Sequence, residues 1–240
     1  MITTILFDLD GTLLDSDMGI FIPLYFRALA AKLSPIVPRE PLLNTLLAST
    51  RLVMQSKGIR VQTNHDVFWA DFLARLGHSY KDLQLLIDAF YRDDFDRLKN
   101  FTATKPQARP LVQAVFAAGY TVAIATQPVF PIVAIAHRLG WANVSDFPYA
   151  LITSYENMHT TKPDPAYYQE ICQMIGRQPA DCLMVGNDPE ADIRPAATLG
   201  MHTFWVCDQG QPPISGMPAH HIGTLTDLVD MIETGSLRGA

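Results

Sequence analysis

Residues 3–12 read Thr-Thr-Ile-Leu-Phe-Asp-Leu-Asp-Gly-Thr. The run from Thr3 to Phe7 is short, apolar and rich in β-branched and aromatic residues, which is typical of a buried strand. Asp8 and Asp10 then interrupt it and place two carboxylates directly after the strand. In an open parallel sheet, ligands bind beyond the carboxyl ends of the strands. If this strand belongs to such a sheet, its two carboxylates lie at the binding edge.

The second half of the chain alternates strand-like and helix-like segments. Short apolar runs predict the strands, and apolar residues at helical spacing predict the helices between them. The predicted strands are Tyr120–Ala125, Ala150–Thr153, Cys182–Val185 and Thr203–Cys207, and the predicted helices are Pro110–Ala118, Ile132–Leu139, Pro165–Ile175, Ile193–Leu199 and Leu225–Ile232. This alternation is typical of parallel strands joined by helical crossovers, so we predict an α/β fold with a Rossmann-like parallel sheet. The pair His220-His221 is expected to end a loop or begin an edge strand.

More than a hundred residues separate the first predicted strand from the second, and the sequence between them is mostly helical. Apolar side chains recur at helical spacing in the stretches Phe21–Leu29, Phe68–Leu76 and Leu83–Phe90. Ser79 and Asp82 have the spacing of a capping box at the start of the third stretch. The segment therefore predicts a helical insertion.

We divide the chain accordingly into an α/β core, residues 1–15 and 103–240, and an inserted helical cap domain, residues 16–102. Thr12–Asp17 and Thr102–Pro106 are the expected linkers, and we expect the cap to open and close on them.

The composition narrows the class of protein. The chain has 240 residues, 48 % hydrophobic residues and a net charge of -6. This length can bury a core without a disulfide or a structural metal, and three cysteines offer no framework for either. The acidic balance argues against nucleic-acid and anionic-membrane partners. No signal peptide or membrane span is recognisable. We expect a cytoplasmic monomer or homodimer whose partner is a small molecule.

Polar side chains follow four of the predicted strands at the points where the strands end. In chain order they are Asp8, Asp10 and Thr12, then Thr126, then Lys162, then Asn187, Asp188 and Asp192. Carboxylates gathered so closely repel one another unless a cation lies among them, and hard oxygen ligands select Mg²⁺ over zinc or copper. A lysine beside such a metal suits an anionic, oxygen-rich substrate, for which phosphate is the obvious candidate.

This set of groups permits a definite chemistry. One aspartate can attack phosphorus and form an aspartyl-phosphate, and a second carboxyl two residues on can protonate the leaving oxygen and later deprotonate a water. Each residue alone also has an ordinary interpretation. Asp10-Gly11 is a common turn pair, Thr126 could cap a helix, and Asp192 could simply lie at a helix N-terminus. The functional interpretation rests on the four positions together.

Four motifs in this order resemble those of the haloacid dehalogenase (HAD) superfamily. Phe7-Asp8-Leu9-Asp10-Gly11-Thr12 resembles its first motif, Ala125-Thr126 the second, Lys162-Pro163-Asp164-Pro165 the third, and Gly186-Asn187-Asp188 with Asp192 the fourth. The helical insertion is similar to the cap of the subfamily with a C1 cap. The resemblance covers the whole predicted sheet domain and points to the phosphatase-like members.

The resemblance implies a role for each matching residue. Asp8 would be the nucleophile and a magnesium ligand, and Asp10 the general acid/base, with its backbone carbonyl on the metal. The residues implied to bind the transferring phosphoryl group are Thr126, Gln127 and Lys162. The residues implied to complete or support the metal site are Thr12, Asn187, Asp188 and Asp192. Superfamily dehalogenases attack carbon and lack the acid found here at Asp10, so Asp10 favours phosphoryl transfer.

Two positions depart from the motifs of the superfamily. The second motif continues as Gln127-Pro128, so the loop loses one backbone donor at Pro128. In the fourth motif Asn187 stands where many members have aspartate, and Asp188 follows. Either Asn187 or Asp188 could ligate the metal; we favour Asp188, because hard divalent ions prefer carboxylate.

The sequence thus predicts a Mg²⁺-dependent phosphomonoester hydrolase acting on a small phosphorylated metabolite through an aspartyl-phosphate. Three alternatives remain open. A phosphomutase of the same superfamily would share every motif, a dehalogenase or other carbon-centred hydrolase is disfavoured by Asp10, and the two departures would suit a catalytically weak phosphometabolite-binding module.

Overall fold

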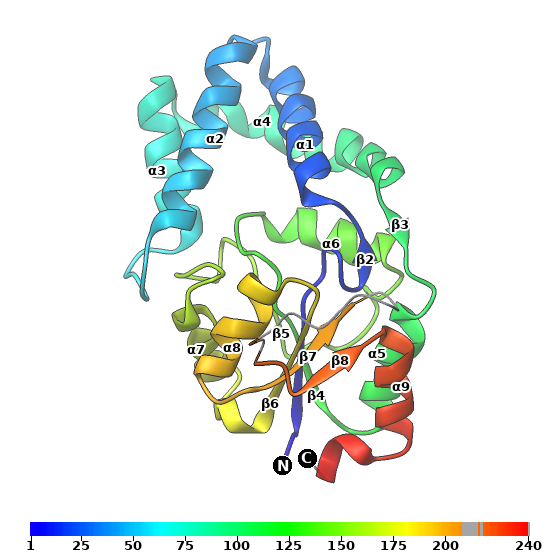
Figure 1. Ribbon diagram of the computed structural model, residues 1–240. Coiled ribbons are helices and arrows are strands. Elements are labelled where there is room, and N and C mark those ends of the chain that lie inside the picture. The colour runs from blue at the N-terminus through cyan, green and yellow to red at the C-terminus, as the bar shows by residue number, and fades with distance from the viewer. Residues whose placement is uncertain (208–215, 217, 240) are drawn as a thin grey trace.

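The fold is built on a six-stranded parallel sheet (Figure 1). The computed structural model describes residues 1–207, 216 and 218–239. The strand order is β5-β4-β1-β6-β7-β8. The strands are β1 (Thr4–Phe7), β4 (Thr121–Ile124), β5 (Leu151–Ile152), β6 (Cys182–Gly186), β7 (His202–Val206) and β8 (His221–Gly223). The predicted α/β class with a parallel sheet is confirmed, and the histidine pair precedes and begins the edge strand β8.

Strand β1 lies at the centre and sets the register of its neighbours. Phe7 pairs with Ile124 of β4 on one side and with Val185 of β6 on the other. The three strands therefore end at the same level. The residues that follow them, beginning with Asp8, emerge together at one edge of the sheet.

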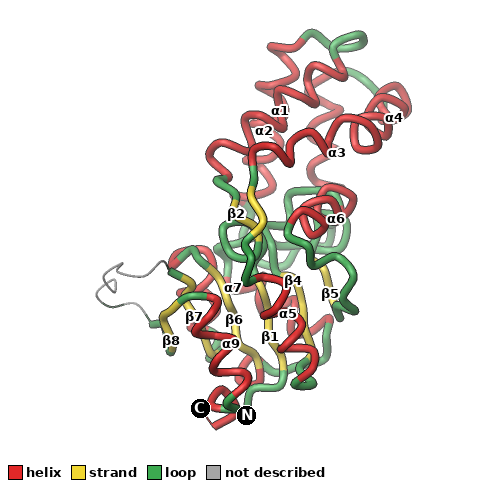
Figure 2. Tube along the Cα trace, turned by 90° about the vertical axis from the view of Figure 1, so that its right-hand side faces the viewer, coloured by secondary structure: helices red, strands yellow, loops and turns green. Residues whose placement is uncertain are grey.

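The central strands are mostly apolar, as expected of strands that helices cover on both faces. Side chains alternate between the faces along a strand. Ile5 and Phe7 pack in one hydrophobic cluster and Leu6 packs in a second cluster on the opposite face. Helices α5 (Ala108–Ala117) and α9 (Leu225–Glu233) cover the first face, and α7 (Pro165–Met174) and α8 (Arg194–Thr198) the second (Figure 2).

The insertion between β1 and β4 is helical, as predicted. It comprises α1 (Met18–Leu33), α2 (Arg39–Gln55), α3 (Asn64–Leu76) and α4 (Tyr80–Ala89), followed by a π-helical turn at Phe90–Asp94 and a 3₁₀ helix at Phe95–Phe101. The four helices lie beyond the carboxyl edge of the sheet, at the end of the molecule opposite the N-terminus (Figure 1). The capping box of Ser79 and Asp82 is confirmed at the start of α4.

The two expected linkers contact each other. Residues Leu14–Asp15 (β2) and Ala103–Thr104 (β3) pair as a two-stranded antiparallel ribbon. Two-residue strands carry no periodic signal, so the sequence alone could not reveal this pairing. The ribbon holds together the two ends of the insertion, at the points where the chain leaves the sheet domain and returns to it.

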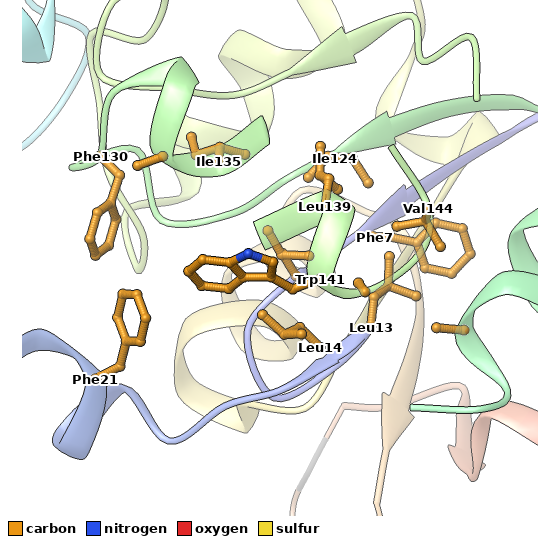
Figure 3. Close-up of a cluster of buried hydrophobic side chains, with 14 of the residues drawn as sticks. Phe7, Leu13, Leu14, Phe21, Ile124, Phe130, Ile135, Leu139, Trp141 and Val144 are labelled. Atoms are coloured by element: carbon orange, nitrogen blue, oxygen red, sulfur yellow. The ribbon is translucent and has the colours of Figure 1, made fainter. Parts of the chain in front are cut away.

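The insertion shares its hydrophobic core with the sheet. Phe21 of α1 is fully buried, and its ring centroid lies 6.3 Å from that of Phe130 and 6.2 Å from that of Trp141 (Figure 3). Phe130 precedes α6 (Ile132–Trp141), and Trp141 ends that helix. Helix α6 therefore lies between the insertion and the sheet and packs against both. The division at residues 16 and 102, and the opening of the cap, stay predictions.

None of the helices within the described ranges is long and apolar enough to cross a lipid bilayer.

We predict that Phe21→Ala lowers the free energy of unfolding by about 3–5 kcal/mol, because it leaves a cavity where the insertion meets α6. Ile20→Ala, at a neighbouring position that is 56 % exposed, should change the stability by less than about 0.5 kcal/mol. Urea denaturation followed by circular dichroism measures both. Equal effects of the two substitutions would contradict the shared core.

Candidate active site

A cavity of about 500 Å³ lies at the carboxyl edge of the sheet, between the strand ends and helices α1 and α2. Eight of the sequence-predicted site residues line it, namely Asp8, Asp10, Thr126, Gln127, Lys162, Asn187, Asp188 and Asp192. The ninth, Thr12, is fully buried just behind Asp8. The structure therefore brings together in one place the polar residues that follow four different strands.

The turn after β1 depends on Gly11. Gly11 has φ +84°, a conformation that favours glycine, and a Cβ at this position would lie 2.6 Å from Nδ2 of Asn187. The tight turn brings Thr12 back toward the strand end. The Thr12 hydroxyl lies 2.9 Å from Oδ2 of Asp8 and 3.0 Å from Oδ1 of Asn187, so it can donate to either. The amide oxygen of Asn187 thus already has a partner.

Lys162 links the carboxylates of Asp8 and Asp192. Its Nζ lies 2.7 Å from Oδ1 of Asp8 and 2.6 Å from Oδ1 of Asp192, and all three side chains are buried. Burial raises the pKa of Asp8 to about 7, and the Lys162 ammonium opposes that rise. Burial acts to lower the pKa of Lys162, but Asp192 and Asp8 together raise it well above its ordinary value. Lys162 is therefore a cation.

The loop after β6 holds Asp192 and Asp188 differently. Oδ2 of Asp192 accepts the backbone N–H of Asp188 at 3.0 Å, so both oxygens of Asp192 have partners. Oδ1 of Asp188 accepts the N–H groups of Glu190 and Ala191, at 2.8 and 3.0 Å. Oδ2 of Asp188 accepts no hydrogen bond from any residue that the structure describes. Asp188 therefore has a carboxylate oxygen available at the cavity, whereas Asp192 orients its neighbours.

Gln127 joins the loop after β4 to the segment that carries Lys162. Its side-chain Nε2 donates to the carbonyl of Lys162 at 3.1 Å, and its Oε1 accepts the N–H of Lys162 at 3.0 Å. Because the side-chain amide is used in this way, contact with a phosphate would have to come from the backbone of Gln127. The Thr126 hydroxyl lies 3.4 Å from Oδ2 of Asp10.

Arg138 of α6 is a site residue that the sequence analysis missed. It is fully buried and its Nη1 donates to Oδ2 of Asp10, while the Ser16 hydroxyl donates to the other Asp10 oxygen at 3.1 Å. The guanidinium carbon lies 4.2 Å from the ring centroid of Phe130. Nothing in the sequence marks Arg138, because an arginine in an amphipathic helix ordinarily faces solvent. Only the packing of α6 under the insertion brings it to Asp10.

Asn64, at the start of α3, was missed as well. This buried side chain donates from Nδ2 to the carbonyls of Pro128 at 3.0 Å and Thr160 at 2.8 Å. Its backbone N–H donates to the carbonyl of Met158. The insertion is thereby tied to the loops that carry Thr126 and Lys162. A single asparagine before a helix predicts no more than a cap or turn, so the sequence contained no signal for this role.

The arrangement offers hard oxygen donors for a divalent cation. Across the described part of the chain, no three His, Cys, Asp or Glu side chains converge as a ready metal cluster. Lys162 lies between Asp8 and Asp192, and Asp10 is directed toward Arg138. The carboxylates of Asp8 and Asp188 and the backbone carbonyl of Asp10 remain, and this all-oxygen set fits Mg²⁺. A buried carboxyl whose pKa is raised, as for Asp8, is also one that a nearby cation would keep ionised.

Comparison with known sequences identifies the class of protein. The sequence model of the haloacid dehalogenase-like hydrolase family matches residues 2–200. The chain belongs to this family and is a hydrolase. Its helical insertion between β1 and β4 is consistent with a C1 cap. The N-acylneuraminate-9-phosphatase of Mus musculus is 36 % identical over 61 residues, which span 25 % of this chain and 25 % of the mouse protein. The chain thus matches about a quarter of the length of this curated relative.

Two solved structures share the fold over almost their whole length. A HAD phosphatase from Thermococcus onnurineus is 20 % identical, with a TM-score of 0.60 and coverage of 96 % of this chain and 98 % of the other. A 2-haloacid dehalogenase from Pseudomonas syringae pv. Tomato DC3000 is 21 % identical, with a TM-score of 0.61 and complete coverage of both chains, 100 % each. At these identities the likeness shows the fold alone. Whether the enzyme attacks phosphorus or carbon must therefore be argued from the residues of the site.

Proposed function

We propose that this hydrolase is a Mg²⁺-dependent phosphomonoester phosphatase that forms an aspartyl-phosphate on Asp8. The observation that supports this best is a pair of carboxyls with different surroundings in one cavity. Asp8 is buried against the Lys162 ammonium, whereas Asp10, two residues on, lies beside the Thr126 hydroxyl and is held by Arg138. This difference supports a role for Asp8 in attack on phosphorus and a role for Asp10 in proton transfer.

In the first step an oxygen of Asp8 attacks phosphorus, and the bond between phosphorus and the ester oxygen breaks. The leaving oxygen takes the proton of the Asp10 carboxylic acid and departs as an alcohol. Lys162 and Thr126 donate hydrogen bonds to the phosphoryl oxygens as negative charge shifts onto the leaving group. Lys162, already fixed by Asp8 and Asp192, requires no reorganisation for this contact.

In the second step a water molecule attacks the phosphorus of the aspartyl-phosphate. The Asp10 carboxylate accepts a proton from this water, and the bond between phosphorus and the Asp8 oxygen breaks. Inorganic phosphate leaves, Asp8 is restored as a carboxylate, and Asp10 is again a carboxylic acid. Asp10 is required in both steps. This requirement distinguishes phosphoryl transfer from carbon-centred hydrolysis.

Asp8, Asp188 and the backbone carbonyl of Asp10 would hold the Mg²⁺. The bound ion would offset the negative charges of the phosphate and of Asp8, which otherwise repel each other. Asn187 is the weaker candidate ligand, because its amide oxygen carries no formal charge and hard divalent ions prefer carboxylate. Asp192 would act by holding Lys162 and the Asp188 backbone in place.

The partial match to N-acylneuraminate-9-phosphatase adds support for a phosphomonoester substrate. A phosphomutase remains the alternative within the same chemistry, since it differs in transferring the phosphoryl group to a second substrate molecule instead of water. A phosphatase releases inorganic phosphate, whereas a phosphomutase does not, so phosphate release distinguishes the two.

We predict magnesium-dependent release of inorganic phosphate from p-nitrophenyl phosphate and from at least one alkyl phosphate. Asp8→Asn should lower kcat by at least about a thousandfold, because it removes the nucleophile. Asp146→Asn, which removes a surface carboxylate that pairs with Arg109, should retain the wild-type rate. If wild type and Asp8→Asn release phosphate equally slowly from every substrate, the proposed function is wrong.

We predict that Mg²⁺ raises the midpoint of thermal unfolding of the wild type, because a ligand that binds only the folded state stabilises it. Asp188→Asn should remove most of this increase. Glu190→Gln, in the same loop but paired with Arg194 at the surface, should retain it. Differential scanning fluorimetry in MgCl₂, with KCl of equal ionic strength as reference, measures the shifts. A full increase in Asp188→Asn would exclude Asp188 as a ligand.

We predict that Arg138 positions Asp10 for proton transfer. The decrease in kcat on replacing Arg138 should therefore depend on the leaving group of the substrate. Arg138→Met should lower kcat on an alkyl phosphate at least about tenfold more than on p-nitrophenyl phosphate, because nitrophenolate departs without a proton. Arg138→Lys, which preserves the charge, should recover part of the loss on the alkyl ester. Steady-state kinetics on both esters provide the test, and equal losses on both would reduce Arg138 to a structural role.

A further inference from the structure

The candidate active site contains few cations. Lys162 is the sole lysine or arginine among the described residues that line the cavity, and it already pairs with Asp8 and Asp192. Residues 208–215, 217 and 240 include no lysine or arginine, and the side chain of Arg238 lies outside what the structure describes. Arg138 is buried beneath the ring of Phe130 and pairs with Asp10. The described lining therefore offers no second lysine or arginine for another anionic group of the substrate.

The wall of the cavity beyond the phosphate end is largely apolar. It is formed by Met18, Ile22, Met54, Val129 and Phe130. Its polar members include the carboxylate of Asp17 and the hydroxyls of Ser16 and Thr50. A second carboxylate or phosphate of the substrate would lie against hydrocarbon, where desolvation opposes it.

A second, much smaller cavity of about 40 Å³ between the insertion and the sheet shares part of this apolar wall. Ile22, Thr50, Val129 and Phe130 line both cavities. The aromatic residues that line the second cavity further in are Tyr25, Phe68, Trp69, Phe72, Tyr91 and Tyr155. The hydrophobic surface thus extends away from the phosphate end without interruption by charge.

The three tyrosine hydroxyls that line this aromatic cavity each take part in a hydrogen bond within the protein. Those of Tyr25 and Tyr91 lie 2.7 Å apart, and the indole N–H of Trp69 donates to the Tyr155 hydroxyl at 3.2 Å. Burial raises the pKa of Tyr25 to about 12, so this phenol is neutral. The cavity therefore offers hydrocarbon and aromatic faces rather than groups for binding a charged or heavily hydroxylated molecule.

We propose that the substrate is the phosphate monoester of an uncharged alcohol with a largely apolar body. The phosphate lies at Asp8 and Lys162, and the apolar body lies against Ile22, Val129 and Phe130 within the same cavity. The inference rests on the proposed phosphatase function and narrows it. Phosphorylated acids, including sugar acids, and bisphosphates become poor substrates, and a mutase that works through a bisphosphate becomes incompatible with this site.

The test uses two esters that differ only in a distant charge, n-butyl phosphate and 4-phosphonooxybutanoate. Their leaving oxygens are chemically alike, so a difference in kcat/KM reports how the site receives the far end of the substrate. We expect butyl phosphate to be preferred at least about tenfold. Extending the series from ethyl to butyl phosphate should raise kcat/KM by about fourfold per methylene, the effect of burying one CH₂ group.

Met54→Arg places a cation on the apolar wall and should shift the ratio of the two kcat/KM values at least about tenfold toward the carboxylate ester. Leu47→Arg adds the same charge to α2 at a position that is 49 % exposed and outside both cavities, so the wild-type ratio should persist. Circular dichroism verifies that both variants are folded. Equal shifts of the kcat/KM ratio in the two variants would show that the effect comes from net charge. That result would contradict contact between the substrate and the apolar wall.

The outcomes separate the inference from the function on which it rests. Phosphate release that is fastest from butyl phosphate supports the inference. Release that is as fast or faster from 4-phosphonooxybutanoate or from a bisphosphate overturns it and leaves the phosphatase assignment intact. If no ester, including p-nitrophenyl phosphate, yields phosphate above the Asp8→Asn background, the proposed function fails and the inference fails with it.

Discussion

The buried ion cluster of Lys162 with Asp8 and Asp192 is the interaction on which the site depends. Two carboxylates cannot remain buried and ionised side by side unless a cation compensates them, and Lys162 contacts both within 2.7 Å. The three residues follow β1, β5 and β6, so the parallel strands must end level for the cluster to form. The geometry of the sheet and the electrostatics of its edge therefore constrain each other. Removing Lys162 would leave two buried carboxylates without a compensating cation.

The surrounding loops maintain this cluster through backbone contacts. Gln127 holds the backbone of Lys162 from the neighbouring loop, and Asn64 reaches from the insertion to the carbonyls of Pro128 and Thr160. The hydrophobic core is likewise continuous between the insertion and the sheet, with Phe21 packed against Phe130 and Trp141. The helices above the sheet thus shape the site as well as cover it. Their apolar surface determines which molecules can extend away from the phosphate end.

Most of the fold and of the polar site could be predicted because their signals are local. A buried parallel strand is a short apolar run, and the polar residues after it emerge at the binding edge, so Asp8, Thr126 and Lys162 could be assigned to one place. The antiparallel ribbon of β2 and β3 could not be predicted, because two-residue strands have no pattern. Asp192 could be placed at the site, but its partnership with Lys162 could not, since a contact between residues thirty positions apart depends on loop conformations.

The sequence by itself determined the class of the protein, the order of its strands and helices, and the residue types that meet at the sheet edge. Each of these follows from periodicity or from a short motif after a strand. Only the tertiary structure decided that Arg138 pairs with Asp10, that Asn64 ties the insertion to the site, and that Lys162 is the single cation among the described lining of the cavity. These contacts join helices of different packing layers. A side chain on a helix has no preferred partner until packing determines which of its faces is buried.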